Sequence, residues 1–414
     1  MSSPAHALTA GAGRSAVELP PAALPLEGFT SVRDPLHVRV VVLDDTVTRI
    51  ALVVIDQTSV FDEQLARTRE ILRRTCAVEP LDCLVVASHT FSAPHVLAPG
   101  AGSKRNALLA EAVDDAVDRA ARAAAAAMRP ARVGFGRGTC EVNAQRDVAT
   151  SDGWWLGIDP AGDSDHGVGV LRIDALDGVP IALLVNFAVQ SSVTKDATTR
   201  TGERRISADL AGAATHRVEE RCGDGTVALF LIGAAGDQAP YPAAARTPPD
   251  ETSDVSTLVD LLGERLADVV LRASEGIGTE PLAVPLRVIH DRVKVPGQTP
   301  PAGLHALRPS TGYAFEAAGT AEAPLVVVRI GDTVLAGVQA ELNARTGLAV
   351  KAASTFPQTC VVTMVNGAAK YMADAGSYDR ITYEAMNSRY AKGAAEIMAE
   401  RIVDVVRSLD SGTG

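Results

Sequence analysis

The hydrophobic residues of the chain form three stretches with the same pattern. In each stretch, two runs rich in Val, Ile and Leu are separated by a short polar turn. The stretches are residues 38–56, 168–187 and 325–341, with turns at Asp44 and Asp45, Asp177 and Gly178, and Gly331 and Asp332. Short turns between runs of β-branched residues are typical of β-hairpins. We therefore predict three hairpins of buried strands.

Each predicted hairpin is followed by a helical pattern and then by another apolar strand. The helices are expected at 61–76, 208–221 and 343–353, and the strands at 83–87, 227–232 and 360–365. Further helices are predicted at 104–128, 254–273 and 386–408. The chain is thus predicted to be an α/β protein with mixed β-sheets, built from three ββαβ-like units and flanking helices. Since units of this size hardly bury their own sheets, we expect one domain over 1–414.

The repeated units place chemically useful side chains after equivalent strands. In sheets of this kind the loops beyond equivalent strand ends gather on one side, and sites tend to be built there. We therefore expect six side chains that follow these strands to converge, namely His89, Asp237, Tyr371, Asp56, Gln190 and Glu341.

Composition and charge exclude several classes of partner. The chain has 47% hydrophobic residues and a formal net charge of -11, without an extended Lys/Arg run. This balance disfavours nucleic acid and anionic membrane surfaces, so a small-molecule substrate is expected. A secretion signal and an apolar span of ~18 residues are both missing from the sequence, which predicts a cytoplasmic protein. The five scattered cysteines predict no disulfide framework and no thiolate metal site. The oligomeric state stays open.

Two histidines and one glutamate are candidates for metal binding. His89 and His95 follow an apolar strand, and neutral imidazole is a common metal ligand. The alternative is a hydrogen-bonded structural histidine. Glu341 ends a nearly uncharged strand, where a buried carboxylate needs a cation or hydrogen-bond donors. The alternative for Glu341 is an acid that complements a helix N-terminus.

Other motifs are less specific. The segment GAAGDQAP suits close approach of the backbone to a ligand, but the P-loop signature GK[ST] is missing. A GxSxG motif, typical of α/β-hydrolases, is also missing. Trp154 and Trp155 lie in a loop that is either a substrate lid or a docked connection, and the tyrosine cluster of 371–383 is usually packing. The residues alone indicate a mixed α/β protein with a candidate metal site.

Eight segments of the sequence occur in a recognisable order. They are TAGAGRSAVELPP, RDPLHVRVVVLDD, VVASHTFSAP, VNAQRD, LLVNFAVQSS, ISADLAG, GAAGDQAP and NGAAKYMADAGSYDRITYE. In this order they resemble the N-terminal catalytic domain of the neutral/alkaline ceramidase family, zinc amidohydrolases that cleave the amide of N-acylsphingosines. The resemblance implies the fold of that domain. The C-terminal β-domain that ceramidases carry has no counterpart in the sequence, so we expect it to be absent.

The resemblance also implies a metal site. The family's zinc ligands are two histidines, a glutamate and a tyrosine. The first histidine corresponds to His89 in HTFS, the glutamate to Glu341 in AELNARTG and the tyrosine to Tyr371 in NGAAKY. The second histidine is replaced by Gln190 in FAVQ, and His95 is a candidate substitute. Carboxylate, imidazole and amide oxygen also bind harder ions, so Zn²⁺ or another divalent ion such as Mn²⁺ is expected.

Catalytic residues are implied in the same way. Arg146 in NAQR corresponds to an active-site arginine, and Tyr383 to the tyrosine that holds the carbonyl oxygen. Asp237 is the candidate base, with the alternative that it satisfies backbone donors in a glycine turn. The second histidine of the family's HTHS motif is replaced by Phe91, and the family's serine by Ala239.

We therefore expect a metal-dependent, amidohydrolase-like enzyme acting on the C–N bond of a small non-lipid metabolite, or forming that bond in reverse. Metal-activated water and oxyanion stabilisation provide the chemistry. A lipid substrate is not expected because the sequence shows no interfacial helix. The alternatives are a noncatalytic ligand-binding member of the fold and a metal-free lyase or isomerase. The latter would use Tyr383 with Asp237 or His95 as acid and base.

Overall fold

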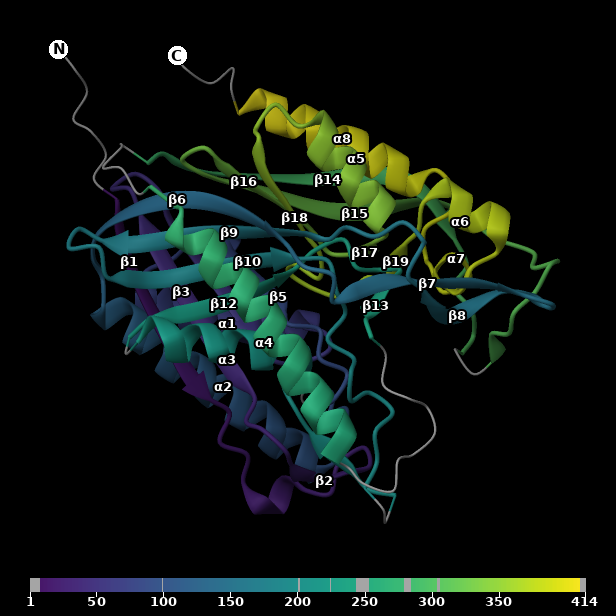
Figure 1. Ribbon diagram of the computed structural model, residues 1–414, viewed down its shortest axis with the longest axis horizontal. Coiled ribbons are helices and arrows are strands. Elements are labelled where there is room, and N and C mark those ends of the chain that lie inside the picture. Colours follow the sequence, from purple (N-terminus) through teal and green to yellow (C-terminus); the bar gives the residue numbers. More distant parts are fainter. Residues whose placement is uncertain are drawn as a thin grey trace.

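The two largest β-sheets of the protein pack face to face, with helices on both outer faces (Figure 1). The structure, a computed structural model, describes residues 8–98, 100–199, 202–223, 225–242, 253–278, 284–303 and 306–409. Its helices are α1 (Asp62–Cys76), α2 (Lys104–Ala126), α3 (Asp209–Cys222), α4 (Ser253–Glu275), α5 (Ala344–Ala353), α6 (Ala375–Arg380), α7 (Tyr383–Met386) and α8 (Ala394–Ser408).

The larger sheet has eight strands in the order β12-β10-β9-β6-β1-β3-β4-β5. Helices α1 to α4 cover its outer face (Figure 1). Its strands are β1 (Thr9–Ala16), β3 (His37–Asp44), β4 (Arg49–Ile55), β5 (Cys83–Ala87), β6 (Arg129–Thr139), β9 (Gly167–Ala175), β10 (Pro180–Phe187) and β12 (Val227–Ile232).

The second sheet has four strands in the order β14-β15-β16-β18, and α5 and α8 lie over it. The amide of Asn186 in β10 donates to the carbonyl of Val361 in β18 at 2.8 Å and joins the two sheets. The strands of this sheet are β14 (Leu286–Gln298), β15 (Ala317–Ile330), β16 (Thr333–Val338) and β18 (Gln358–Val362).

Three small sheets lie beyond the ends of the main strands. One has the order β13-β7-β8, and the other two pair β17 with β19 and β11 with β2. Their strands are β2 (Phe29–Val32), β7 (Asn143–Thr150), β8 (Gly153–Asp159), β11 (Arg204–Ile206), β13 (Gln238–Pro240), β17 (Glu341–Leu342) and β19 (Tyr371–Met372). Two of these sheets, β13-β7-β8 and β17-β19, carry the candidate site.

The predicted α/β class and the three ββαβ units are confirmed. The units are β3-β4-α1-β5, β9-β10-α3-β12 and β15-β16-α5-β18. In each unit the hairpin strands are antiparallel and the last strand runs parallel to its neighbour in the hairpin. The first two units share the larger sheet, whereas the third forms the smaller one.

The helix predicted at 386–408 begins later than expected. Helix α8 starts at Ala394, because Gly393 at its N-cap has a left-handed φ of +93°. Residues 383–386 instead form the separate short helix α7, which begins after Thr382, whose side chain accepts from the backbone of Ala385. The loop between the two helices carries residues of the candidate site.

The alanine-rich helix α2 packs closely against β1. A Cβ at Gly11 or Gly13 would lie 2.2 or 2.3 Å from a carbonyl oxygen of this helix, so these two positions require glycine. Small side chains on the facing side of α2, such as Ala120 and Ala124, are fully buried. None of the helices in the described part of the chain combines the length and the apolar character needed to cross a bilayer.

Candidate functional site

The candidate site forms where strands of the two main sheets end. Thr90 and Ser191 form a parallel bridge beyond β5 and β10, which places the preceding residues His89 and Gln190 side by side. In the two-stranded sheet of β17 and β19, Glu341 is the register partner of Tyr371. The structure therefore brings these four residues together, as the sequence predicted.

His89 is held in one orientation by the backbone. Its φ is +62°, in the left-handed region that non-glycine residues rarely adopt. Such a conformation costs ~1–3 kcal/mol and is often found at functional sites. The ring nitrogen Nδ1 donates to the carbonyl of Thr58 at 2.7 Å, because a carbonyl oxygen can only accept. The other nitrogen, Nε2, therefore faces Glu341 Oε2 at 3.1 Å.

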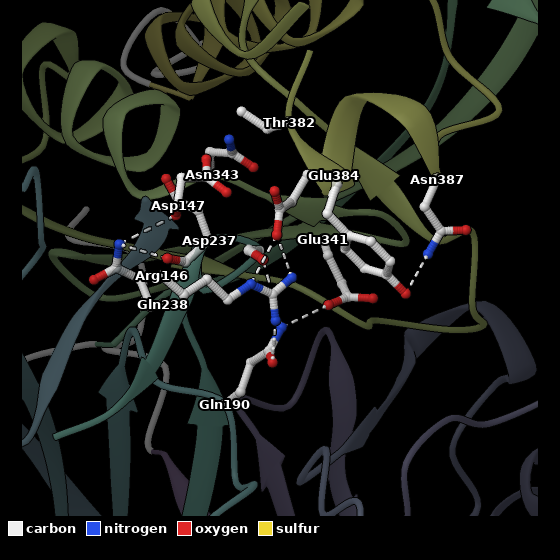
Figure 2. A network of polar contacts seen from close by, with 12 residues as sticks. Arg146, Asp147, Gln190, Asp237, Gln238, Glu341, Asn343, Thr382, Glu384 and Asn387 are labelled. Carbon is white, nitrogen blue, oxygen red and sulfur yellow. Dashed lines mark hydrogen bonds and ion pairs between the residues drawn. The ribbon is translucent and has the colours of Figure 1, made fainter. Parts of the chain in front are cut away.

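Glu341 is a buried carboxylate with charged neighbours. Its Oε2 also accepts from Nε2 of Gln190 at 3.3 Å. Burial alone would raise the pKa of Glu341, but the charge and hydrogen bond of His89 and the charge of Arg146 outweigh it, so the pKa is lowered. In Figure 2 one carboxylate oxygen faces Gln190 and the other points away from it. Glu341 is thus ionised at neutral pH.

Arg146 in β7 is the central cation of the site (Figure 2). Its Nε donates to Glu384 Oε1 at 2.7 Å, and its Nη1 donates to Gln190 Oε1 at 2.6 Å. The guanidinium carbon lies 5.3 and 6.0 Å from the ring centres of Tyr371 and Tyr383. Burial would lower the pKa of Arg146, but the neighbouring Tyr371 and Glu384 raise it. Arg146 also fixes the amide of Gln190, with its oxygen toward the guanidinium.

Tyr383 lies at the half-exposed edge of the site. Its ring makes edge-to-face contacts with Trp155 at 5.6 Å and with Tyr371 at 6.0 Å between ring centres. Its Oη accepts from Nδ2 of Asn387 at 3.3 Å. Burial raises the pKa of Tyr383 although the charge of Arg146 lowers it in part. The phenol therefore keeps its proton and can donate it in a hydrogen bond.

Asp147 and Glu384 are site residues that the sequence did not indicate. Alternation along β7 would place Arg146 and Asp147 on opposite faces. The strand pairing shifts register between Gln145 and Asp147, and Oε1 of Gln145 accepts from the backbone N–H of both Arg146 and Asp147. This bulge turns both side chains toward Glu384. Burial raises the pKa of Asp147 to about 10, and the charge of Glu384 adds to the effect.

Asp237 joins the elements around the site. Its Oδ1 accepts from the backbone N–H of Ala344 at 2.8 Å and from Gln238 at 3.2 Å, and its Oδ2 accepts from Gln145 at 2.8 Å. Burial raises its pKa to about 6 in spite of these donors. Because both oxygens are engaged, the arrangement matches the alternative reading of a turn aspartate that satisfies donors, not that of a base.

Two residues singled out in the sequence lie outside the site: His95, a candidate substitute ligand, and Asp56, one of the six residues expected to converge. His95 has a half-exposed side chain, and its Nδ1 contacts Glu27 Oε2 at 2.7 Å. His95 follows the bend at 91–93 and contacts Glu27 instead of the site, so the structure does not support it as a substitute ligand. Asp56 is buried and pairs with Arg39 at 3.2 Å, because β3 presents that guanidinium beside the end of β4.

The residues expected to bind a metal do not form a complete set of ligands. The 3.1 Å between His89 Nε2 and Glu341 Oε2 is close to the ~3.3 Å between two ligands ~2 Å from a tetrahedral zinc. Gln190 instead presents an N–H, because Arg146 holds its oxygen. Burial raises the pKa of Tyr371, so binding a metal as a phenolate would require the loss of a proton that this phenol holds more tightly than usual.

Among the residues that the structure describes, no group of three or more His, Cys, Asp or Glu side chains could hold a metal ion. A catalytic zinc usually has three protein ligands. The His89 and Glu341 pair provides two, and a guanidinium lies beside them. The set therefore does not fit the expected zinc or manganese ion.

Comparisons with known proteins agree with this fold. No protein-family model and no curated protein matches the sequence. Among solved structures, the chain is similar to the neutral ceramidase from Pseudomonas aeruginosa, with a TM-score of 0.76 and 17% identity over 98% of this chain and 75% of that one. It is also similar to a ceramidase complexed with C2, with a TM-score of 0.75, 18% identity and the same coverage. The expected ceramidase-like fold is confirmed.

Proposed function

We propose that this chain is an enzyme that hydrolyses the amide bond of a small non-lipid molecule, or forms that bond in the reverse direction. One observation carries the proposal: an ionised buried carboxylate, Glu341, lies in the same network as a guanidinium and a protonated phenol, Arg146 and Tyr383. Amide hydrolysis needs a base for water and donors for the developing oxyanion. The ceramidase-like fold supports the same reaction class.

Tyr383 and Arg146 are the groups that stabilise the oxyanion. Tyr383 is half-buried, and the guanidinium carbon of Arg146 lies 6.0 Å from the centre of its ring. A positioned donor of this kind is worth ~2.7–4 kcal/mol in the transition state. Glu384 and Gln190 hold Arg146 in place before substrate arrives, so little reorganisation is needed.

Glu341 is the base of this scheme. The oxygen that points away from Gln190 takes a proton from the attacking water, whose oxygen forms a bond to the carbonyl carbon. The same proton then goes to the departing nitrogen as the C–N bond breaks. His89 and Gln190 orient the carboxylate through its other oxygen. This scheme uses neither the serine replaced by Ala239 nor the histidine replaced by Phe91, and no step runs through a metal ion.

A noncatalytic ligand-binding role is the second candidate, and one observation favours it. Arg146 already donates to Glu384 and Gln190, so part of its hydrogen-bonding capacity is taken. In that case small amides would bind without turnover. Binding measured by calorimetry together with the absence of any product would support this candidate over the enzyme.

The test is a panel of N-acyl amino acids and N-acyl amines, with release of the amine as the readout. Tyr383→Phe is expected to lower kcat about 10²-fold with little change in KM, because the phenol acts mainly in the transition state. Tyr378→Phe is the matched control, since Tyr378 donates to the carbonyl of Tyr390 instead. The absence of product from the whole panel, or equal losses in both variants, would overturn the proposal.

A further inference from the structure

Two buried carboxyl groups lie behind Arg146 without enough donors. Glu384 is fully buried, and its Oε1 takes hydrogen bonds from both Nε and Nη2 of Arg146. Its other oxygen, Oε2, and both oxygens of Asp147 are buried without a donor among the described residues. The side chain of Asp147 is 1% exposed, and Nη2 of Arg380 stays 3.8 Å from its Oδ2.

The two carboxyl groups are neighbours, because Glu384 raises the pKa of Asp147 both through its charge and through a side-chain hydrogen bond. Two ionised carboxylates have lone pairs only and repel each other, so such a contact requires a hydrogen on one of them. Glu384 already has the guanidinium of Arg146 as its ion-pair partner, so the hydrogen is placed on Asp147. We propose that Asp147 is a protonated positioning residue, whose carboxyl O–H donates to Oε2 of Glu384, while Glu384 in turn holds the guanidinium of Arg146.

The charges around Asp147 agree with a retained proton. Glu384 approaches from α7, Asp237 from the turn before β13, Arg380 from α6, and Arg146 is its neighbour in β7. Burial and the negative charges of Glu384 and Asp237 raise the pKa of Asp147 to about 10, and Arg146 offsets this in part. Because Asp147 keeps its proton, it adds no negative charge beside Arg146. More of the positive charge of Arg146 therefore acts on Glu341 and the tyrosines.

The retained proton has a measurable consequence for stability. The unfolded chain releases this proton near the ordinary aspartate pKa of ~3.9. The folded protein keeps it up to pH about 10. Because the folded state binds the extra proton in this window, the stability of the wild type falls as pH rises through it.

The experiment compares urea unfolding of the wild type and Asp147→Asn between pH 5 and pH 8. The asparagine amide replaces the carboxyl O–H as a donor to Glu384 and does not titrate. The ratio of folded to unfolded protein should therefore increase for the variant relative to the wild type by up to about tenfold per pH unit. Asp56→Asn is the matched control, because Asp56 is a buried aspartate that accepts from Arg39. That variant should be less stable than the wild type at every pH.

The proposal would be overturned if Asp147→Asn, like Asp56→Asn, were less stable than the wild type by the same amount at every pH between 5 and 8. If Asp147→Asn does not fold, infrared spectra of the wild type with ¹³C-labelled aspartate decide the matter. At pH 8 Asp237, with a pKa of about 6, is ionised. An isotope-shifted carbonyl band of a protonated carboxylic acid should still appear, and its absence would contradict a proton on Asp147. Neither readout needs a substrate, so this inference is tested separately from the proposed function.

Discussion

In the part of the chain that the structure describes, the buried arginines Arg39 and Arg146 each lie in a cluster with two buried carboxyl groups, and the two clusters differ in how the carboxyl groups are satisfied. Arg39 donates from Nε to Glu219 at 2.8 Å and from Nη1 to Asp56 at 3.2 Å. Glu219 also accepts from Arg14 and from the backbone N–H of Ala228. Burial would raise the pKa of Glu219, but the charge and hydrogen bond of Arg39 lower it.

The second cluster, around Arg146, is balanced differently. Glu384 and Gln190 both accept hydrogen bonds from the guanidinium of Arg146. Asp147 accepts none from it, and its pKa is raised. The Arg39 cluster ties β3 to α3 and gives each acid a donor, which is the arrangement expected of a structural ion pair. The Arg146 cluster lies among tyrosines at the strand ends and keeps a perturbed carboxyl group, which is the pattern expected of a functional site. The following variants test this contrast.

Arg39→Met should have the largest effect on stability. It leaves Glu219 and Asp56 buried without their cation, and breaking a buried pair in this way costs about 3–5 kcal/mol of unfolding free energy. Urea unfolding at pH 7 measures the loss. A loss below about 1 kcal/mol would show that the Arg39 cluster is not the structural member of the comparison.

Glu384→Gln should have an intermediate effect on stability. Arg146 loses its carboxylate partner, and an unsatisfied buried group costs about 1–3 kcal/mol. The variant should also lose activity on any substrate found, because the guanidinium is no longer fixed beside Tyr383. Thermal unfolding and turnover are measured on the same preparation. An unchanged turnover number would show that Glu384 is not needed to position Arg146 for the reaction.

The fold was more predictable from the sequence than the site was. The three hairpins and their following helices are local patterns, so 38–56, 168–187 and 325–341 gave the units correctly. The site depends on contacts between distant segments. The bulge at Gln145, which brings Asp147 beside Arg146, breaks the alternation on which strand patterns rely. The amide orientation of Gln190 depends on Arg146, 44 residues earlier in the chain.

A smaller, pH-dependent effect is expected for Glu341→Gln. The pKa of Glu341 is lowered in the folded protein, so the carboxylate adds stability above its unfolded pKa of ~4.3 and loses it as pH falls through the folded value. The variant should therefore be less stable than the wild type at pH 7, and the difference should narrow at pH 3. A difference that is constant across this range would contradict the charge interaction with His89 and Arg146.

His95→Ala should have the smallest effect. Its side chain is half-exposed and pairs with Glu27 at the surface, and such pairs contribute about 0.2–1 kcal/mol. Activity should be unchanged because His95 is outside the network of Arg146. A large loss of turnover in this variant would instead show that His95 takes part in the reaction.

The most direct test of the account is zinc binding by the chelator-treated wild type, measured by calorimetry beside Gln190→His. Arg146 and the Gln190 amide lie where a third ligand would be needed. We therefore expect no saturable zinc binding at micromolar concentrations for the wild type. Gln190→His should bind zinc, because it presents a third ligand beside His89 and Glu341. One tightly bound zinc or manganese ion per wild-type chain, lost in His89→Ala, would contradict the account.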